Sequence, residues 1–264
     1  MPRSIVTLTT DFGLRDSYVA EMKAVILSIN PSTVIVDVSN EIEKFNIRMG
    51  AYTLACAAPY FPTGTIHVAV VDPNVGTKRK AILVQTERAY FIGPDNGILA
   101  LAARNQSIRH VYEVSNRKLM LSKVSGTFHG RDIFAPAAAY LANGVPPEDF
   151  GTELREIEKP AFANVIRQTN RLIGEVVHID GFGNVITSFL VEDVESMKAK
   201  AVVNIKLNDV RFKLRLCETY ADAKKQELFA IIGSHGFLEI SANKGNAAQK
   251  FKVKSGDKIS LLTP

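Results

Sequence analysis

The segment VAVVDPNVGTKRKAILVQT, residues 68–86, places a carboxylate and a guanidinium at the two ends of one short loop. Asp72 ends an apolar run and Arg79 precedes the next one, while Pro73 and Gly76 shape the turn between them. An acid beside a permanent cation can close a turn as an ion pair, or the two groups together can bind a polar reactant. The spacing alone allows both interpretations.

Four other groups of polar residues interrupt the apolar pattern. They are TTDFGLRDS (9–17), GPDNG (93–97), TFHGRDIFAP (127–136), and the pair HIDGFGN (178–184) and GSHGFLEISANKG (233–245). Asp11 and Asp16 follow an apolar run and precede a helical pattern, so they either cap that helix or bind a ligand beyond the strand. His129 is the one histidine of five inside a cluster of glycines and charges, which makes it a candidate for chemistry.

Several familiar catalytic motifs are excluded by their context. The DFG at 11–13 lacks the HRD loop and the glycine-rich phosphate loop of a kinase. The GFGN stretch leads into an apolar strand pattern and not into a helix, so it does not indicate NAD or ATP binding. His178 and Asp180 are two residues apart and have no third ligand at a telling spacing, so we expect no metal site.

The elements that must position these residues change in kind along the chain. Strands are predicted at 4–10, 33–38, 65–72, 81–86, 89–93 and 109–114, and helices at 19–29, 47–61, 97–105 and 132–144. Asp16 or Ser17 is expected to cap the first helix. Strands that alternate with helices predict a mostly parallel sheet covered on both faces.

A polar, proline-bearing stretch at 145–160 predicts a domain boundary. Beyond it short strand patterns dominate, and Asn208-Asp209 is expected to form a two-residue hairpin turn. We therefore predict an α/β sandwich domain over 1–160 and a smaller, all-β, barrel-like domain over 161–264.

Composition narrows the class of protein. Of the 264 residues, 46% are hydrophobic, and the formal net charge is +5 without any long basic block, so we expect neither disorder nor a nucleic-acid partner. The two cysteines are far apart and the opening residues lack a long apolar stretch, so we expect a cytoplasmic protein with no membrane segment.

The motifs taken together, in this order, resemble the SAM hydroxide adenosyltransferases, which hydrolyse S-adenosyl-L-methionine (SAM) and are related to bacterial fluorinase and chlorinase. The resemblance runs nearly end to end and rests on TTDFG, VVDPNVGTKR, PDNG, FHGRD, DGFGN and SANKG. It implies an α/β N-terminal domain, a barrel-like C-terminal domain, and a homotrimer. Each site of that trimer is expected between one subunit's N-terminal domain and a neighbour's C-terminal domain.

The resemblance also implies roles for residues of the first half. Asp11 matches the aspartate that holds the ribose hydroxyls, and Asp16 and Ser17 fall in the segment that contacts the methionine part. Phe45 stands where the halogenases carry a tryptophan beside the substrate.

Further substrate contacts are implied in the second half. Asp180 matches the partner of the methionine ammonium, Asn184 the residue that reads the adenine edge, and Ser234 a ligand of the methionine carboxylate. The adenine is expected to meet the backbone around Asn243 and Lys244. Phe182 belongs to the same expected substrate-binding set, and His235 occupies a position where a halogenase has arginine.

Asp72 is the position that separates the two activities of this group. The halogenases have a tyrosine there, and an ionised aspartate would repel a halide. Asp72, Arg79 and His129 complete the set found in the hydroxide-transferring members. The resemblance therefore implies hydrolysis of SAM to adenosine and methionine without a metal or redox cofactor. A SAM-dependent halogenase, a non-catalytic adenosine- or SAM-binding protein, and a metal-dependent hydrolase remain the alternatives.

Overall fold

The computed structural model describes residues 3–194, 202–207 and 210–262 of the chain. The chain separates into two compact units, Met1–Pro160 and Ala161–Pro264. No helix within the described ranges is both long and apolar enough to cross a membrane. The Asn208-Asp209 turn expected from the sequence lies outside the described residues.

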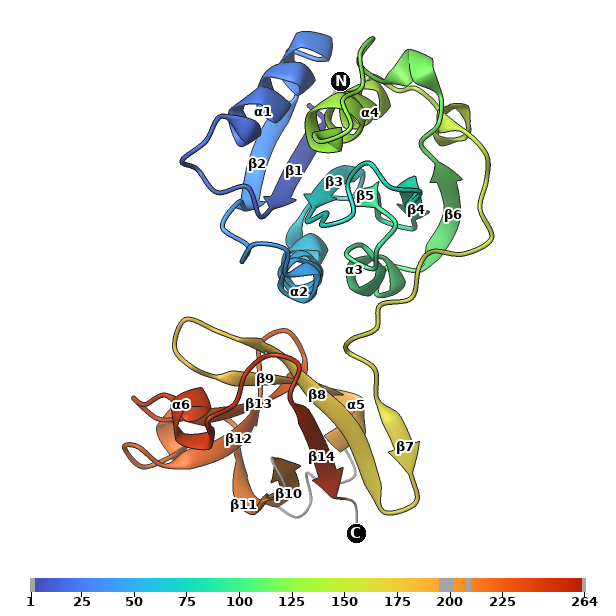
Figure 1. Cartoon of the computed structure of the whole chain (residues 1–264). Helices are drawn as coiled ribbons and strands as arrows, with labels where there is room; N and C mark the ends of the chain where they lie inside the picture. Colours follow the sequence, from blue (N-terminus) through green and yellow to red (C-terminus); the bar gives the residue numbers. More distant parts are fainter. Residues whose placement is uncertain (1–2, 195–201, 208–209, 263–264) are drawn as a thin grey trace. The chain divides into compact units, whose positions relative to one another are not determined.

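The first unit is a six-stranded sheet between two layers of helices (Figure 1). Its strands are β1 (Ile5–Thr10), β2 (Val34–Ser39), β3 (Thr65–Val70), β4 (Ala81–Thr86), β5 (Ala89–Pro94) and β6 (Ile108–Glu113). Its helices are α1 (Tyr18–Ile29), α2 (Ile47–Ala57), α3 (Ala100–Arg104) and α4 (Ala135–Ala142), with a π-helical turn at Gly130–Phe134 and 3-10 turns at Ala58–Tyr60, Arg117–Leu119 and Pro147–Phe150. The α/β class predicted from the sequence is confirmed.

The strand order of this sheet is β2-β1-β3-β5-β4-β6. The pairs β1–β2, β1–β3 and β3–β5 are parallel, whereas β4 is antiparallel to both β5 and β6. Only Glu87 and Arg88 separate β4 from β5. A parallel pair needs a crossover, and so short a connection permits only a hairpin. Helices α1 and α4 pack on one face, and α2 and α3 pack on the other.

The second unit is a closed barrel (Figure 1). Its strands are β7 (Ile166–Gln168), β8 (Arg171–Ile179), β9 (Val185–Leu190), β10 (Val202–Leu207), β11 (Val210–Cys217), β12 (Leu228–Ile232), β13 (Phe237–Ala242) and β14 (Lys258–Leu262), with short helices α5 (Val191–Val194), Tyr220–Asp222 and α6 (Ala247–Phe251). The strand order β14-β10-β11-β12-β13-β9-β8 closes through pairing of β14 with β8, and β7 flanks β8. The barrel-like class predicted for the second half is confirmed.

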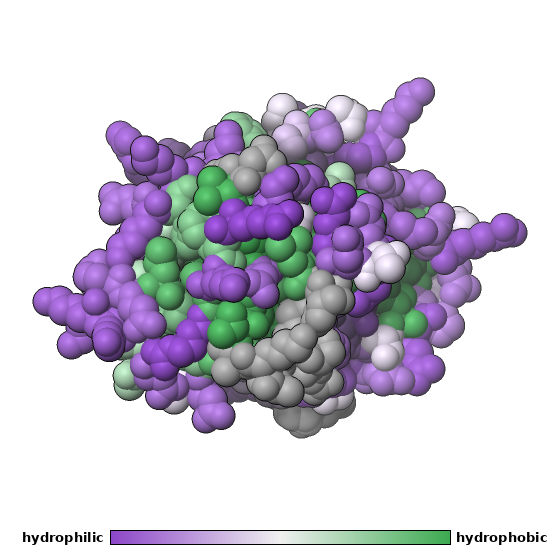
Figure 2. Space-filling view, turned by 90° about the horizontal axis from the view of Figure 1, so that it is seen from below, coloured by the Kyte–Doolittle hydropathy of each residue, from purple (hydrophilic) through white to green (hydrophobic). Residues whose placement is uncertain are grey.

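Apolar side chains, which alternate with polar ones along the strands, fill the interior of this barrel. In β10, Val203, Ile205 and Leu207 are buried, and they pack with the inward residues of the other strands. Hydrophilic side chains cover much of the face seen in Figure 2, and apolar side chains show between them, mainly in an area left of centre. The larger exposed apolar residues of this unit include Phe182, which is 81% exposed, and Ile166.

Candidate functional site

Two aspartates mark the carboxyl edge of the first sheet. Thr10 of β1 pairs with Val70 of β3, so Asp11 and Asp72 lie just beyond neighbouring strand ends. The chain leaves β1 toward α1 on one face and leaves β2 toward α2 on the other, so β1 and β3 flank the point where the strand order reverses. In open α/β sheets a ligand binds outside the strand ends at this point.

Asp72 and Arg79 form a buried ion pair across their loop. Arg79 Nη2 and Nε donate to Asp72 Oδ2 at 2.5 and 2.9 Å, and Nε also lies 3.1 Å from Oδ1. The side chains are only 8% and 5% exposed, and the guanidinium carbon lies 5.4 Å from the ring centre of Phe134. Removing one partner of such a pair leaves a buried charge uncompensated.

The Arg79 guanidinium also determines the protonation state and the tautomer of His129. Arg79 Nη2 lies 2.6 Å from His129 Nδ1, and because a guanidinium can only donate, Nδ1 must be the acceptor. The ring proton is therefore on Nε2 and the ring is neutral. Burial, and then the charge of Arg79, lower the pKa of His129 and outweigh the opposite influence of Asp72 and Asp132. The geometry therefore makes His129 a neutral hydrogen-bond donor.

A close approach of two glycines brings the loops of these residues together. A β-carbon at Gly76 would lie 2.4 Å from the carbonyl oxygen of Gly126, and Gly76 has a φ of 78°. Only glycine meets both requirements without strain. The loop that carries Asp72 and Arg79 can thereby pack on the loop that leads to His129.

These loops border a cavity of about 380 Å³ in the first unit. Among the residues expected from the sequence, Asp11, Asp16, Phe45, Asp72 and His129 line this cavity. Arg79 is outside the described lining and reaches the cavity through its contacts with Asp72 and His129. A pocket of this size with a few convergent polar groups is typical of a small-molecule site.

Sequence reasoning missed the aromatic part of the wall. Phe12, Tyr18 and Phe128 line the cavity, and Phe128 packs edge-on against Tyr18 and Phe12 with ring centres 5.1 and 5.5 Å apart. The sequence gives one weak signal for this cluster, because each aromatic residue adjoins a polar motif residue. The remaining unexpected lining residues are Lys44, Val70, Val75, Thr127 and Gly130.

Asp11 is held in place by the loop that carries Phe45. Its Oδ2 accepts a hydrogen bond from the Phe45 amide at 2.9 Å, and Lys44 Nζ donates to its backbone carbonyl. Phe45 has a φ of 65° and its side chain is 70% exposed. A left-handed backbone is costly for a bulky residue, and such strain often accompanies function. This backbone conformation places the Phe45 ring at the edge of the cavity, beside the buried Asp11.

Asp16 and Ser17 precede helix α1. Ser17 occupies the N-cap position, but its side chain makes no capping hydrogen bond, so the predicted side-chain cap is wrong. Its backbone is helical and its hydroxyl instead donates to Glu21 Oε1 at 2.6 Å. Asp16 borders the cavity and Ser17 lies outside the described lining.

Three expected residues of the second unit share one turn between β8 and β9. Asp180 Oδ1 accepts from the amides of Phe182 and Asn184, both at 2.9 Å, and Oδ2 accepts from Asn184 Nδ2 at 2.8 Å. A β-carbon at Gly183 would collide with Asn246, 2.2 Å away. Asp180 thus builds its own turn, in which Asn184 is buried and Phe182 is exposed.

Ser234, Asn243 and Lys244 lie on two other loops of the second unit. Ser234 Oγ is 3.4 Å from His235 Nδ1, and Asn243 Nδ2 donates to the Ala223 carbonyl at 2.6 Å. Lys244 has a φ of 52°. These residues lie in a different unit from the cavity described above.

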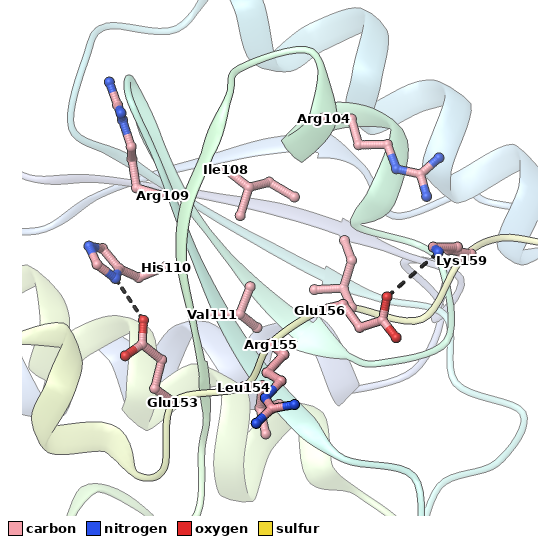
Figure 3. Close-up of a pocket in the computed structure, with 11 residues that line it drawn as sticks. Arg104, Ile108, Arg109, His110, Val111, Glu153, Leu154, Arg155, Glu156 and Lys159 are labelled. Atoms are coloured by element: carbon pink, nitrogen blue, oxygen red, sulfur yellow. Dashed lines mark hydrogen bonds and ion pairs between the residues drawn. The ribbon is translucent and has the colours of Figure 1, made fainter.

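A second cavity, of about 610 Å³, lies between strand β6 and the segment 153–159 (Figure 3). Its carboxylates are already paired, since Glu153 contacts His110 Nδ1 at 2.8 Å and Glu156 contacts Lys159 Nζ at 3.6 Å. None of the residues expected to do chemistry lines it. Within the described ranges, no three His, Cys, Asp or Glu side chains gather as metal ligands would.

Comparison with known families and proteins covers nearly the whole chain. A model of the SAM hydroxide adenosyltransferase N-terminal domain matches residues 6–151, and one of the C-terminal domain matches residues 174–260. The (R)-S-adenosyl-L-methionine hydrolase of Methanocaldococcus jannaschii is 38% identical over 98% of this chain and 95% of its own length. A fluorinase of Actinopolyspora mzabensis is 28% identical over 98% of this chain and 97% of its own length.

A solved structure agrees with these sequence matches. The crystal structure of an uncharacterized conserved protein from Thermotoga maritima superimposes with a TM-score of 0.89. It is 39% identical, and the match covers 97% of this chain and 99% of that protein.

Proposed function

The chain belongs to the SAM hydroxide adenosyltransferase family and is a SAM hydrolase, and we propose that Asp72, Arg79 and His129 carry out its reaction. SAM is converted to adenosine and methionine. The observation that carries the proposed roles is the buried contact of an acid, a cation and a neutral imidazole beside a cavity at the strand-order reversal.

The substrate supplies its own leaving group. A water oxygen attacks the ribose C5′, the C5′–S bond breaks, and its electron pair stays on sulfur, so the sulfonium becomes the neutral thioether of methionine. The water loses one proton, and the balance is SAM plus water giving adenosine, methionine and a proton. The enzyme's task is to hold and activate one water, whose pKa of about 15.7 in bulk leaves little hydroxide.

Asp72 is the proton acceptor of this set. His129 Nδ1 already accepts from Arg79 and its Nε2 carries a proton, so the ring has no free lone pair. A carboxylate offers about four lone-pair sites, and Arg79 leaves Asp72 with capacity for a water hydrogen. Arg79 compensates the charge of Asp72 and sets the His129 tautomer.

The cavity of the first unit would hold the nucleoside part of SAM. Buried Asp11, which the Phe45 amide orients, is placed to accept hydrogen bonds from the ribose hydroxyls. The exposed ring of Phe45 would cover the sugar, and Asp16 and Ser17 would lie toward the methionine part. Arranging the reacting atoms in this way can supply about 7–11 kcal/mol of the barrier.

The second unit would complete the site from a neighbouring subunit. In this proposal Asp180 pairs with the methionine ammonium, Ser234 binds its carboxylate, and Asn184 reads the adenine edge. The backbone near Asn243 and Lys244 would contact the adenine, and Phe182 would pack on it. The assembly that places these groups at the first unit's cavity is a homotrimer, which sedimentation or light scattering would test.

We place the enzyme in the cytoplasm, and we expect neither a nucleic-acid partner nor a membrane partner. The chemistry requires no metal or redox cofactor, because the sulfonium leaves without acid or redox assistance.

The decisive experiment incubates chelator-treated protein with SAM in water enriched in ¹⁸O. The proposal expects adenosine that carries ¹⁸O at the 5′ position, methionine, and one proton released per turnover. A 5′-halo-5′-deoxyadenosine formed with chloride or fluoride would indicate a halogenase. Tight adenosine binding without turnover would indicate a sensor, and loss of activity with the chelator would indicate a metal-dependent hydrolase.

A further inference from the structure

A chain of polar contacts lies behind the wall of the cavity. Ser17 Oγ donates to Glu21 Oε1 at 2.6 Å, and Arg131 Nη1 donates to Glu21 Oε2 at 2.8 Å. Arg131 Nε then donates to Asp132 Oδ1 at 2.7 Å. The chain links the start of helix α1 to the π-helical turn that follows His129.

Asp132 ties down the loop that carries His129. Its side chain is fully buried, and its Oδ2 accepts from the Ser125 amide at 2.8 Å. Its own amide donates to the Phe128 carbonyl at 3.1 Å, and the Phe128 amide donates to Ser125 Oγ at 3.1 Å. Asp132 therefore holds both ends of segment 125–128, which precedes His129: its carboxylate binds Ser125 and its backbone amide binds Phe128.

Arg131 supports the aromatic wall from outside. Its guanidinium carbon lies 5.0 Å from the ring centre of Phe128, which in turn packs on Tyr18 and Phe12. Because Glu21 holds the other side of the guanidinium, Arg131 connects this wall to helix α1.

The charge of Asp132 and the exposure of the Glu21–Arg131 pair indicate that these residues position the loop more than they stabilise the fold. Burial alone would raise the pKa of Asp132, but hydrogen bonds from Arg131 and Ser125 lower it overall, so the carboxylate remains ionised. The side chains of Arg131 and Glu21 are each about one-third exposed. A pair with that exposure contributes little to folding. Its clearest consequence is where Phe128 and His129 lie.

We propose that Glu21, Arg131 and Asp132 are positioning residues for SAM hydrolysis. They hold His129 in contact with Arg79 and hold the Phe128 wall against the substrate. This inference rests on the proposed roles of Asp72, Arg79 and His129. π-Helical turns are frequent at functional sites. Here the turn at Gly130–Phe134 contains both Arg131 and Asp132, directly after His129.

The test compares Glu21→Gln, Arg131→Met and the double variant with a matched control, Asp37→Asn. Asp37 of strand β2 accepts a hydrogen bond at 2.6 Å from Lys23, which lies on helix α1 as Glu21 does. Its side chain is exposed to a similar degree as that of Glu21, and it does not line the cavity. We expect Glu21→Gln to lower kcat about 10-fold or more while Tm stays near wild type, because the Glu21–Arg131 pair is about one-third exposed. Arg131→Met should lower kcat at least as much and should also lower Tm, because it leaves the buried Asp132 carboxylate uncompensated. The control should retain full kcat.

The double variant tests whether the residues act as a unit. If they do, its loss of kcat is close to that of either single variant and smaller than their product. A kcat within twofold of wild type for Glu21→Gln, or a loss of kcat in that variant that follows a fall in its Tm, would overturn the inference. A wild-type protein without SAM hydrolysis would refute the proposed function instead, so the two failures are distinguishable.

Discussion

Arg79 donates a hydrogen bond from Nη2 to Nδ1 of His129 across 2.6 Å, while the same group contacts Asp72. A proton on His129 Nδ1 would place two donors against each other. The cation and the imidazole are thus arranged so that only the neutral ring fits.

The first prediction concerns acid pH. Protonation of His129 breaks its contact with Arg79, so activity should fall as pH drops through the pKa of His129. Because burial and Arg79 lower that pKa, and Asp72 and Asp132 oppose them only in part, this limb should lie below the ordinary value of 6.5. The measurement is kcat against pH from 4 to 9. An acid limb at or above pH 6.5 would contradict the neutral, Arg79-bound ring.

The second prediction concerns the reacting groups. Asp72→Asn removes the proton acceptor, and Arg79→Ala leaves a buried carboxylate uncompensated, so each should lower kcat by about 10²-fold or more. Adenosine should still bind, because Asp11 and the aromatic wall are unchanged.

Matched controls for these variants lie on the surface. Arg109 forms an exposed ion pair with Glu87, so Arg109→Ala and Glu87→Gln repeat the same chemical changes away from the cavity. Unchanged kcat in Asp72→Asn would remove this carboxylate from the reaction.

The third prediction concerns Gly76. Gly76→Ala adds a β-carbon 2.4 Å from the Gly126 carbonyl oxygen, which must push apart the loops of Asp72 and His129. Gly64→Ala is the control, since Gly64 also has a positive φ (87°) but no atom lies within 4 Å of its β-carbon. Both variants pay about 1–2 kcal/mol for the backbone conformation, but only Gly76→Ala should also lose kcat. Equal kinetics in the two would show that the glycine contact does not align the site.

The fourth prediction concerns stability in acid. His67 is fully buried, stacks on Phe91 at 5.0 Å, and burial lowers its pKa to about 4. The unfolded chain binds a proton at this residue below about pH 6.5 and the folded chain does not, so stability falls as pH drops from 6.5 to 4. The contribution of this one residue is about 3 kcal/mol.

Replacement by an uncharged ring isolates that contribution. The unfolding free energy of His67→Phe, measured by urea titration, should depend less on pH than that of wild type. The difference between the two proteins should change by about 3 kcal/mol between pH 7 and pH 4. A constant difference across this range would show that His67 is protonated in the folded state.

Much of this arrangement can be predicted from the sequence, because it depends on local pattern. The apolar runs predict buried strands at 4–10 and 65–72, which the structure shows as β1 and β3, and parallel strands place Asp11 and Asp72 at one edge of the sheet. Only two residues separate β4 and β5, which explains their antiparallel pairing. The motif at 127–136 singles out His129, although without its partners.

The rest depends on side chains that meet only in the folded chain. Nothing near His129 in sequence reveals that Arg79 occupies its Nδ1, and this contact decides its charge. The aromatic wall joins Phe12, Tyr18 and Phe128, whose rings are brought together by helix α1 and the π-helical turn. Ser17 has the residue type of a helix cap, yet Glu21 takes its hydroxyl. Propensity cannot report such competition between partners.

The order of the site residues along the chain has a consequence for protein synthesis. Asp11 and Asp72 leave the ribosome well before His129 and the π-helical turn behind it, and α4 follows later still. The unit that holds all of them packs around one core, so a growing chain that stops before residue 129 has the acid and the cation but not the imidazole that Arg79 contacts. A chain released before that residue therefore lacks one member of the proposed catalytic set.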